Sequence, residues 1–431
     1  MQDLLNSSGT EFCYEDFANI LISISPDIIN AEKISVALSG GVDSIALLHL
    51  SKTFCDKNKI KLVAITINHD LRAESEQEAL EVGAYCKSLN IEHHIYKWDH
   101  QDIKSNIQEE ARNARYNLLL SCCKLEKIPY LLTGHHLGDQ IEQILISLSQ
   151  GAGIYSFCIP ENTILNGIKI IRPLLNFSKE EIIGYTKENK LKWWEDPTNI
   201  ADKYLRNKIR PIASRLLNIS NQKKLITAIS NIKRASNSLA QITEDYIKNN
   251  VTFSHLGYAK FKTNSYKSLS DEIKFSIIRS LILKISKQEG DLRLNSIKII
   301  DQAISKGQKK SLGGCCFTSE NDICIIIRDF GRTSPQICKI EDTIMWDNRF
   351  RIISKLKLEV RKLSLNELNL LLKEDPQSFN FDDELTQSVK KTIVLTLPAI
   401  FSLEKLLVIP HIYYYNPKVN REIDIQLIKI A

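Results

Sequence analysis

The sequence lacks the features of a membrane-spanning or disulfide-bonded protein. No uncharged apolar run approaches the roughly 18 residues that a transmembrane helix needs. The N-terminal segment carries four acidic residues and no early basic cluster, so we expect neither a secretory signal nor a transit peptide. None of the ten cysteines is spaced as Cys-x-x-Cys, which favours reduced thiols over disulfides or a metal cluster. Together these absences predict a cytoplasmic protein.

Acidic residues are missing from one long stretch of the chain. Residues 203–234 hold nine lysines and arginines and no aspartate or glutamate, although the net charge of the whole chain is only +6. Residues 349–362 hold six basic residues and one acid, Glu359. Such blocks are often solvated helix faces, but two of them in one chain favour a polyanionic partner.

The first half of the chain alternates short apolar segments with helical patterns. This alternation predicts an α/β fold, in which helices cover both faces of a parallel sheet. In such sheets ligands bind beyond the carboxyl ends of the strands. The expected strands are 34–38, 62–68, 91–96, 130–133 and 168–171. The expected helices are 44–54, 74–89, 106–125, 139–149 and 179–189.

The pattern changes beyond residue 215. Apolar residues recur every three or four positions between 220 and 286, which predicts a small helical domain. Strand-like segments are expected at 323–327, 350–354 and 393–397, with a polar helix near 365–373. A chain of 431 residues is too long for one small core, so we expect several domains. The expected domains are 1–216 (α/β), 217–333 (mainly helical) and 340–431 (α+β).

A glycine pair follows the first expected strand, in the segment SGGVDS at 39–44. The segment matches neither a dinucleotide-binding motif nor a Walker loop, and no lysine follows it within reach. Backbone N–H groups at a helix N-terminus, with the hydroxyls of Ser39 and Ser44, suit a phosphate. A carboxylate beside phosphates requires a cation, so Asp43 indicates bound Mg²⁺. The alternative is that Asp43 only caps the helix and the glycines form a tight turn.

The segment at 39–44 resembles the pyrophosphate loop of the ATP pyrophosphatases, and an ordered set of further motifs narrows the resemblance. These are NHDLR at 68–72, ARNARY at 111–116, TGHHLGDQIE at 133–142, RPLL at 172–175, DPTN at 196–199, YLRN at 204–207 and IR at 209–210. The set resembles the tRNA(Ile)-lysidine synthase family. Weaker matches are LGG at 312–314, WDNRF at 346–350 and LP at 397–398.

The resemblance implies a parallel-sheet ATP-pyrophosphatase domain, similar to the adenine nucleotide α-hydrolases, followed by two tRNA-binding domains. It also implies a two-step ligase reaction that forms a carbon–nitrogen bond. ATP adenylates the C2 carbonyl oxygen of the wobble cytidine, position 34, in tRNA(Ile) with a CAU anticodon. An amine of free L-lysine then attacks C2 and expels AMP. The implied partners are ATP with Mg²⁺, L-lysine and the tRNA. A homodimer is compatible with the sequence, which does not fix the oligomeric state.

The resemblance also implies roles for individual residues. The expected ATP-binding residues are Ser39, Gly40, Gly41, Val42, Asp43 and Ser44, with Asp43 as metal ligand. The expected catalytic residues are Asp43, Asp139, Glu142 and Arg206. Other contacts to substrate or nucleotide are expected from His69, Arg72, Arg112, Arg115, Gly134 and His135. Contacts to tRNA are expected from Lys203, Arg210, Arg215, Arg349 and Arg351.

Some assignments stay open at this point. Asp139 and Glu142 lie three positions apart on one helix face, so either could hold the cationic lysine amine and take its proton. Alternatively, both only compensate the helix dipole. The chain also departs from the family pattern, with Asn68 and Gly138 at usually acidic positions and Gln143 in place of threonine.

Two other functions compete with the ligase. A tRNA 2-thiolation enzyme of the same superfamily would activate the same carbonyl but deliver sulfur, and such enzymes generally use cysteines that this chain does not place in its motifs. A non-catalytic RNA-binding protein would account for the basic segments, but not for the glycine loop together with Asp139 and Glu142.

Overall fold

The computed structural model describes two compact units, residues 1–233 and 234–431, which we treat separately. The described residues are 12–68, 75–98, 107–194, 205–219, 222–287, 292–329, 338–340, 343–347, 349–353, 358–379, 381–402, 405–412 and 414–415. Within these residues no helix combines the length and apolarity that a membrane crossing requires. The three-domain division expected from the sequence stays a prediction.

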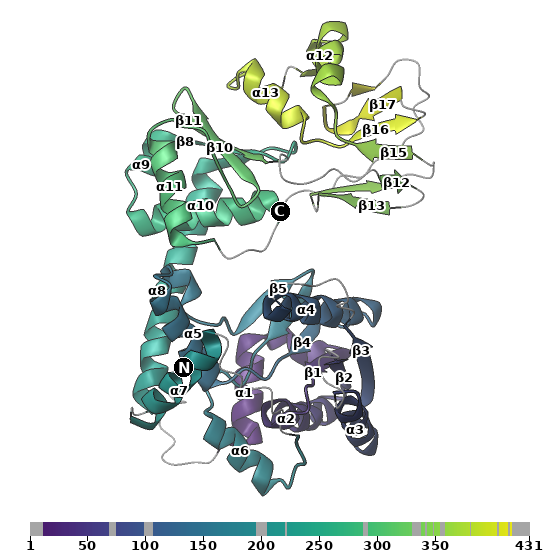
Figure 1. The fold of residues 1–431 in the computed structure, drawn as a ribbon, viewed down its shortest axis with the longest axis vertical. Helices are drawn as coiled ribbons and strands as arrows, with labels where there is room; N and C mark the ends of the chain where they lie inside the picture. The colour runs from purple at the N-terminus through teal and green to yellow at the C-terminus, as the bar shows by residue number, and fades with distance from the viewer. Residues whose placement is uncertain are drawn as a thin grey trace. The chain divides into compact units, whose positions relative to one another are not determined.

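The first unit is built from one mixed sheet and its covering helices (Figure 1). Its strands are β1 Lys33–Ala37, β2 Lys61–Asn68, β3 Glu92–Lys97, β4 Tyr130–Leu132, β5 Asn162–Leu165 and β6 Ile168–Ile171. Its helices are α1 Tyr14–Ile24, α2 Val42–Asn58, α3 Ser75–Ser88, α4 Ile107–Leu125, α5 Leu137–Ser149, α6 Lys179–Glu188 and α7 Leu205–Ile219. Helix α8, Gln222–Asn250, crosses from the first unit into the second.

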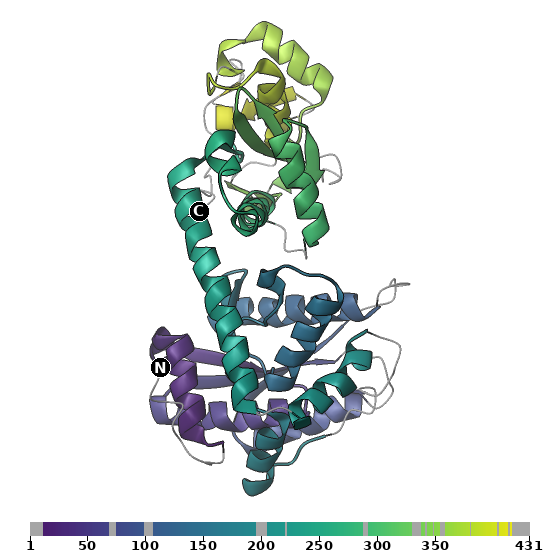
Figure 2. The same cartoon turned by 90° about the vertical axis from the view of Figure 1, so that its left-hand side faces the viewer.

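The strand order is β3-β2-β1-β4-β6-β5, and all neighbours are parallel except the edge pair β5 and β6. Helices cover both faces of this sheet (Figure 1 and Figure 2). Residues of α1, α2, α3 and α6 form one apolar cluster against β1 and β2, and residues of α4 form another against β2, β4 and β6. The predicted α/β fold with a parallel sheet is therefore confirmed.

The edge strand β5 is the one element of this sheet that alternation did not predict. Ile164 is 68% accessible, and only Thr163 and Leu165 of the four strand residues are half-buried, so the strand is too short and too exposed for its alternation to stand out. Asn166 and Gly167 connect it to β6 with φ values of 52° and 82°. An Asn-Gly pair in this conformation is a strong hairpin signal, so the turn could have revealed the strand.

The second unit contains two larger sheets and a two-stranded ribbon. The first sheet has the order β7-β8-β11-β10-β9, with strands Val251–Phe253, Ala259–Lys262, Ile323–Arg328, Cys315–Glu320 and Lys310–Leu312. It packs with helices α9 Thr263–Lys267, α10 Asp271–Ser286 and α11 Leu294–Ser305. The second has the order β12-β15-β16-β17-β18, with strands Cys338–Ile340, Leu358–Arg361, Ala399–Ser402, Lys405–Ile409 and Tyr414–Tyr415. The ribbon pairs β13 Thr343–Trp346 with β14 Phe350–Ile353, and the last helices are α12 Leu365–Glu374 and α13 Gln387–Val394.

One strand expected in this unit is wrong. The segment 393–397 was expected as a strand, but α13 continues to Val394 and the next strand begins only at Ala399. Thr386 caps this helix, and its hydroxyl oxygen accepts a hydrogen bond from Val389 N. Val389 and Ile393 are both buried, so the apolar residues form a helical stripe rather than a strand face.

Candidate active site

The glycine loop joins the end of β1 to the start of α2. Gly41 is the N-cap of α2, and Gly40 has φ of 86°, which favours glycine. A Cβ atom on Gly40 would also lie 2.9 Å from Val82 Cγ2. Ser44 Oγ donates to Gly41 O at 2.8 Å and lies 3.2 Å from Ser39 Oγ. The loop therefore presents backbone N–H groups and the exposed residue Ser39 at a helix N-terminus, as phosphate binding requires. Ser44 is 6% exposed, and its hydroxyl holds the loop together by also accepting from Ser39 N at 3.3 Å.

A second loop, after β4, lies directly against the first. A Cβ atom on Gly134 would be 3.3 Å from both the carbonyl carbon and the carbonyl oxygen of Asp43, so a larger residue would press on the α2 backbone. Strands β1 and β4 are neighbours in the sheet, and their carboxyl ends therefore meet. The neighbouring His135 is held through its Nδ1 atom, 3.0 Å from Thr133 Oγ1. The structure thus brings the motifs at 39–44 and 133–142 together.

His136 lies between two of the expected catalytic carboxylates, although its sequence context did not single it out. It is the N-cap of α5, and its Nδ1 atom accepts a hydrogen bond from Gly138 N at 3.0 Å. Because Nδ1 accepts, the neutral ring carries its proton on Nε2. That atom lies 4.0 Å from Asp43 Oδ1 and 3.8 Å from Asp139 Oδ2. His136 therefore connects the glycine loop to the start of α5.

The ring of His136 also explains the departure at Gly138. A Cβ atom on Gly138 would lie 2.7 Å from His136 Cε1 and 3.0 Å from Nδ1. An aspartate at 138 would therefore displace the imidazole from its present position. Gly138 thus leaves room for the imidazole, whose Nε2 atom lies 4.0 Å from Asp43 Oδ1 and 3.8 Å from Asp139 Oδ2.

The two carboxylates of α5 lie in different environments. Asp139 Oδ2 accepts from His136 N at 2.9 Å, and its side chain is 21% exposed. Glu142 is only 6% exposed, and its Oε1 atom accepts from Arg210 Nε of α7 at 2.9 Å. The pair joins α5 to α7, where Leu137, Ile141 and Ala213 share a small apolar cluster. Glu142 thus holds α7 in place, while Asp139 stays partly accessible.

Lys179 is a further residue at this site that the sequence did not reveal. It begins α6, and its Nζ atom donates to Asp43 Oδ1 at 2.8 Å and to Oδ2 at 2.6 Å. The two residues are 136 positions apart in the chain. No lysine follows the glycine loop in sequence, but α6, which packs against α2 in the same apolar cluster, supplies one at its first residue. Only the complete fold places it there.

The structure describes the remaining expected residues unevenly. His69, Arg72 and Lys203 lie outside the described residues. Arg112 and Arg206 lie on α4 and α7, whose backbones are described there, but their side chains are not. Arg115 is half-buried, with its guanidinium 5.5 Å from the centre of the Tyr116 ring. Arg215 and Arg351 are exposed.

Arg349 does not fit its expected contact with tRNA. Its side chain is fully buried, with Nε donating to Asp347 Oδ2 at 2.7 Å and Nη2 donating to Thr396 O at 2.8 Å. A guanidinium in this position cannot reach a phosphate on a bound RNA. We therefore correct this expectation and assign Arg349 to the core of the second unit.

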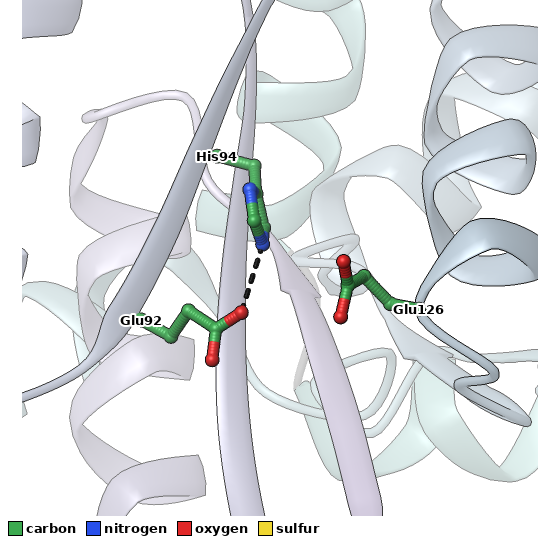
Figure 3. A group of neighbouring side chains, drawn as sticks. All are labelled: Glu92, His94 and Glu126. Carbon is green, nitrogen blue, oxygen red and sulfur yellow. Dashed lines mark hydrogen bonds and ion pairs between the residues drawn. The ribbon is translucent and has the colours of Figure 1, made fainter.

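A second group of ligand-type side chains lies at the opposite, amino-terminal edge of the sheet (Figure 3). His94 Nε2 lies 3.0 Å from Glu92 Oε1, and Glu126 is nearby. Lys61 binds Glu92, while Lys33 binds Glu126 at 3.1 Å. The hydrogen bond from Lys61 holds the pKa of the Glu92 carboxyl below its usual value. Because lysines already neutralise both carboxylates, we interpret this group as an ion-pair network.

The described cysteines are not arranged for sulfur chemistry at the glycine loop. Burial raises the pKa of Cys55 and of Cys86 to about 12, which disfavours the thiolate. Cys123, whose pKa burial raises to about 11, lies under the sheet beside Ser35. These thiols behave as small apolar core residues.

Comparison with known proteins shows which family the sequence matches. Residues 14–216 match the family model described as a PP-loop domain. The tRNA(Ile)-lysidine synthase of Orientia tsutsugamushi is 31% identical over 90% of this chain and 91% of its own length. The tRNA(Ile)-lysidine synthase of Wolbachia pipientis wMel is 38% identical over 74% of this chain and 76% of its own. A solved U34-tRNA thiolase from Methanococcus maripaludis aligns with a TM-score of 0.45 at 17% identity, over 52% of this chain and 81% of its own. This chain belongs to the tRNA(Ile)-lysidine synthase family.

Proposed function

We propose that this protein ligates free L-lysine to C2 of the wobble cytidine of tRNA(Ile) with a CAU anticodon, at the expense of ATP. The oxygen on C2 attacks the α-phosphorus of ATP, and the bond to the β-phosphate breaks to release pyrophosphate. An amine of lysine then adds to C2, and the bond from C2 to the adenylate oxygen breaks, so that AMP leaves. A base takes the proton that the amine nitrogen loses. The products are lysidine in the tRNA, AMP and pyrophosphate.

One observation carries this proposal. The glycine loop, Gly134 and the carboxylates of Asp43 and Asp139 meet at the carboxyl ends of β1 and β4, in a chain similar over most of its length to tRNA(Ile)-lysidine synthases. Nucleotide-binding α/β sheets use this edge for their ligands. Backbone donors at the start of α2 suit the triphosphate, and the carboxylates suit a cation or an amine.

Asp43 is the residue we propose as ligand for Mg²⁺. Its carboxylate is 25% exposed beside the loop, and carboxylate oxygens are the protein ligands that this ion prefers. A bound magnesium ion would neutralise phosphate charge during pyrophosphate release. The loop N–H groups and the hydroxyls of Ser39 and Ser44 would hold the phosphates themselves.

The second step needs a neutral amine and therefore a base. Asp139 is the better candidate because it is partly exposed, and His136 N fixes its orientation. Glu142 is buried against Arg210, so we assign it to positioning α7, which also carries Arg206. This difference between the two carboxylates makes the choice of base testable.

The proposed tRNA contacts are the exposed basic residues Arg215 and Arg351, together with the solvent-facing part of Arg210. Phosphate contacts of this kind position the RNA, and contacts to bases supply specificity. Lys203, outside the described residues, belongs to the same basic segment of the sequence and stays a prediction.

The proposed function is tested by mass analysis of the wobble cytidine. After incubation of tRNA(Ile) bearing a CAU anticodon with ATP, L-lysine and the protein, we expect the nucleoside to gain the mass of lysine less water. Omission of lysine, or its replacement by sulfide, should leave cytidine unmodified. A mass gain with sulfide, or none with lysine, would contradict the proposal.

Asp139→Asn and Glu142→Gln should differ in their effects on adenylation and lysine transfer. Asp139→Asn is expected to slow lysine transfer roughly 100- to 10,000-fold, because it removes the proposed base, while tRNA-dependent ATP–pyrophosphate exchange is largely retained. Glu142→Gln should lower exchange and transfer together and by less, because the amide oxygen can still accept from Arg210. Single-turnover assays of both steps measure the difference. The reverse pattern would make Glu142 the base.

A further inference from the structure

The ion pair between Lys179 and Asp43 is a feature that phosphate binding by the glycine loop does not by itself require. The ammonium contacts both oxygens of the carboxylate that we propose as the metal ligand. Lys179 is 37% exposed and Asp43 25%, so the pair is accessible from solvent. Partly exposed ion pairs contribute little to folding stability. The stability of the fold therefore does not by itself account for a lysine at this position.

The backbone around Lys179 is fixed independently of this pair. Ser178 and Glu181 form reciprocal hydrogen bonds at the start of α6, with Ser178 N donating to Glu181 Oε2 at 2.7 Å. Ile182 is fully buried against α2, and Tyr185 OH lies 2.7 Å from His49 Nδ1. Helix α6 therefore holds the lysine stem at the loop even when its ammonium group changes partner.

A carboxylate cannot keep both of its oxygens on an ammonium group and also offer them to a magnesium ion. Magnesium requires close oxygen ligands in a nearly octahedral arrangement. When the ion and a nucleotide bind, the ammonium must therefore leave Asp43 at least in part. Its flexible four-carbon stem and three donors then meet the most negative groups that have entered, which are the phosphates.

We propose that Lys179 is the phosphate-binding cation of the glycine loop. In the nucleotide-free protein it neutralises Asp43, and with bound nucleotide it transfers to the triphosphate and stabilises the charge of the departing pyrophosphate. This proposal rests on the function proposed above and adds a substrate-binding residue to it. The role is that of the lysine in a Walker loop, supplied here by a helix that is distant in sequence.

Two binding measurements on purified full-length protein test the proposal without any turnover. Pyrophosphate and ATP are titrated calorimetrically in the presence of a chelator, and Mn²⁺ alone is titrated by electron paramagnetic resonance. In Lys179→Ala we expect pyrophosphate and metal-free ATP to bind about 10- to 100-fold more weakly, because a charged hydrogen bond to phosphate is lost. Mn²⁺ should bind more tightly, because the ammonium no longer competes for Asp43. Lys179→Arg should recover part of the phosphate affinity.

The matched control is Lys187→Ala, an exposed lysine in the last turn of the same helix, which should leave both titrations unchanged. Equal melting temperatures of the variants exclude loss of fold. Unchanged pyrophosphate binding in Lys179→Ala, or parallel weakening of pyrophosphate and Mn²⁺, would overturn the proposal. A wild-type protein that binds pyrophosphate through Lys179 but forms no lysidine would refute the proposed function alone, so the two failures are distinguishable.

Discussion

Replacement of Asp43 by asparagine is expected to slow adenylation strongly while the nucleotide still binds. Asparagine has the shape of aspartate, so α2 and its first turn should be preserved, but it removes the charge on which a magnesium ion depends. Loss of charge stabilisation at the departing pyrophosphate should reduce tRNA-dependent ATP–pyrophosphate exchange roughly 100- to 1,000-fold. In the same variant Lys179 loses its carboxylate partner and becomes available to phosphate. Binding of ATP in the presence of a chelator should therefore be equal to that of the wild type or tighter.

The matched control for Asp43→Asn is Asp56→Asn. Asp56 lies in the last turn of the same helix, is 61% exposed and pairs only with Lys52 among the ion pairs of the described residues. The Asp56→Asn variant should catalyse tRNA-dependent ATP–pyrophosphate exchange at the wild-type rate. Full exchange activity in Asp43→Asn would remove the metal role of Asp43, whereas loss of metal-free ATP binding would indicate a damaged loop.

The glycine loop could be predicted from the sequence because everything that defines it is local. A buried strand, two glycines and an apolar start of a helix follow one another within a few residues, and the structure places them as expected at the carboxyl edge of the sheet. The position of Gly134 at the same edge could also be predicted, because it directly follows the expected strand 130–133. Such strand-end positions depend only on the order of elements, which the alternation of patterns reveals.

Lys179 and His136 could not be assigned in the same way. Ser178 followed by Glu181 predicts that a helix begins next to Lys179. This signal does not predict which residue of another segment the lysine contacts. His136 belongs to a recognised motif, yet its place between Asp43 and Asp139 depends on the rotamer set by Gly138 N. The Lys179 contact joins segments that are distant in sequence, and the His136 contacts depend on the orientation of its ring. A sequence pattern contains neither kind of information.

The basic run at 349–362 shows where charge patterning failed. A cluster of arginines and lysines indicates a polyanion partner only if its side chains reach solvent. Arg351 does so, but the side chain of Arg349 is fully buried in the second unit. The acceptors that allow its burial are Asp347, two positions before it, and the carbonyl of Thr396. The second of these could be found only from the fold.

Replacement of Asp347 by asparagine is expected to be the most destabilising conservative change in the second unit. Its carboxylate accepts from Arg349 and, through two nitrogen atoms at 2.9 and 3.0 Å, from Arg328. Both guanidinium groups have no exposed side-chain surface. Burial already lowers the pKa of Arg349 to about 10, which shows how unfavourable the charge is there. Without the carboxylate, two buried cations lose their counter-ion, and we expect a loss of about 3–5 kcal/mol in the free energy of unfolding.

Hydrogen exchange followed by mass spectrometry measures this loss separately in each unit. Amides of β10, β11 and β14 should lose protection in Asp347→Asn, while those of β1 and β2 in the first unit should not. The control is Asp322→Asn, which changes an exposed aspartate that has φ of 61°, similar to the 50° of Asp347. It therefore separates the buried charge from the effect of the turn. Protection unchanged in both variants would mean that backbone carbonyls such as Gly314 O are sufficient to hold the two arginines.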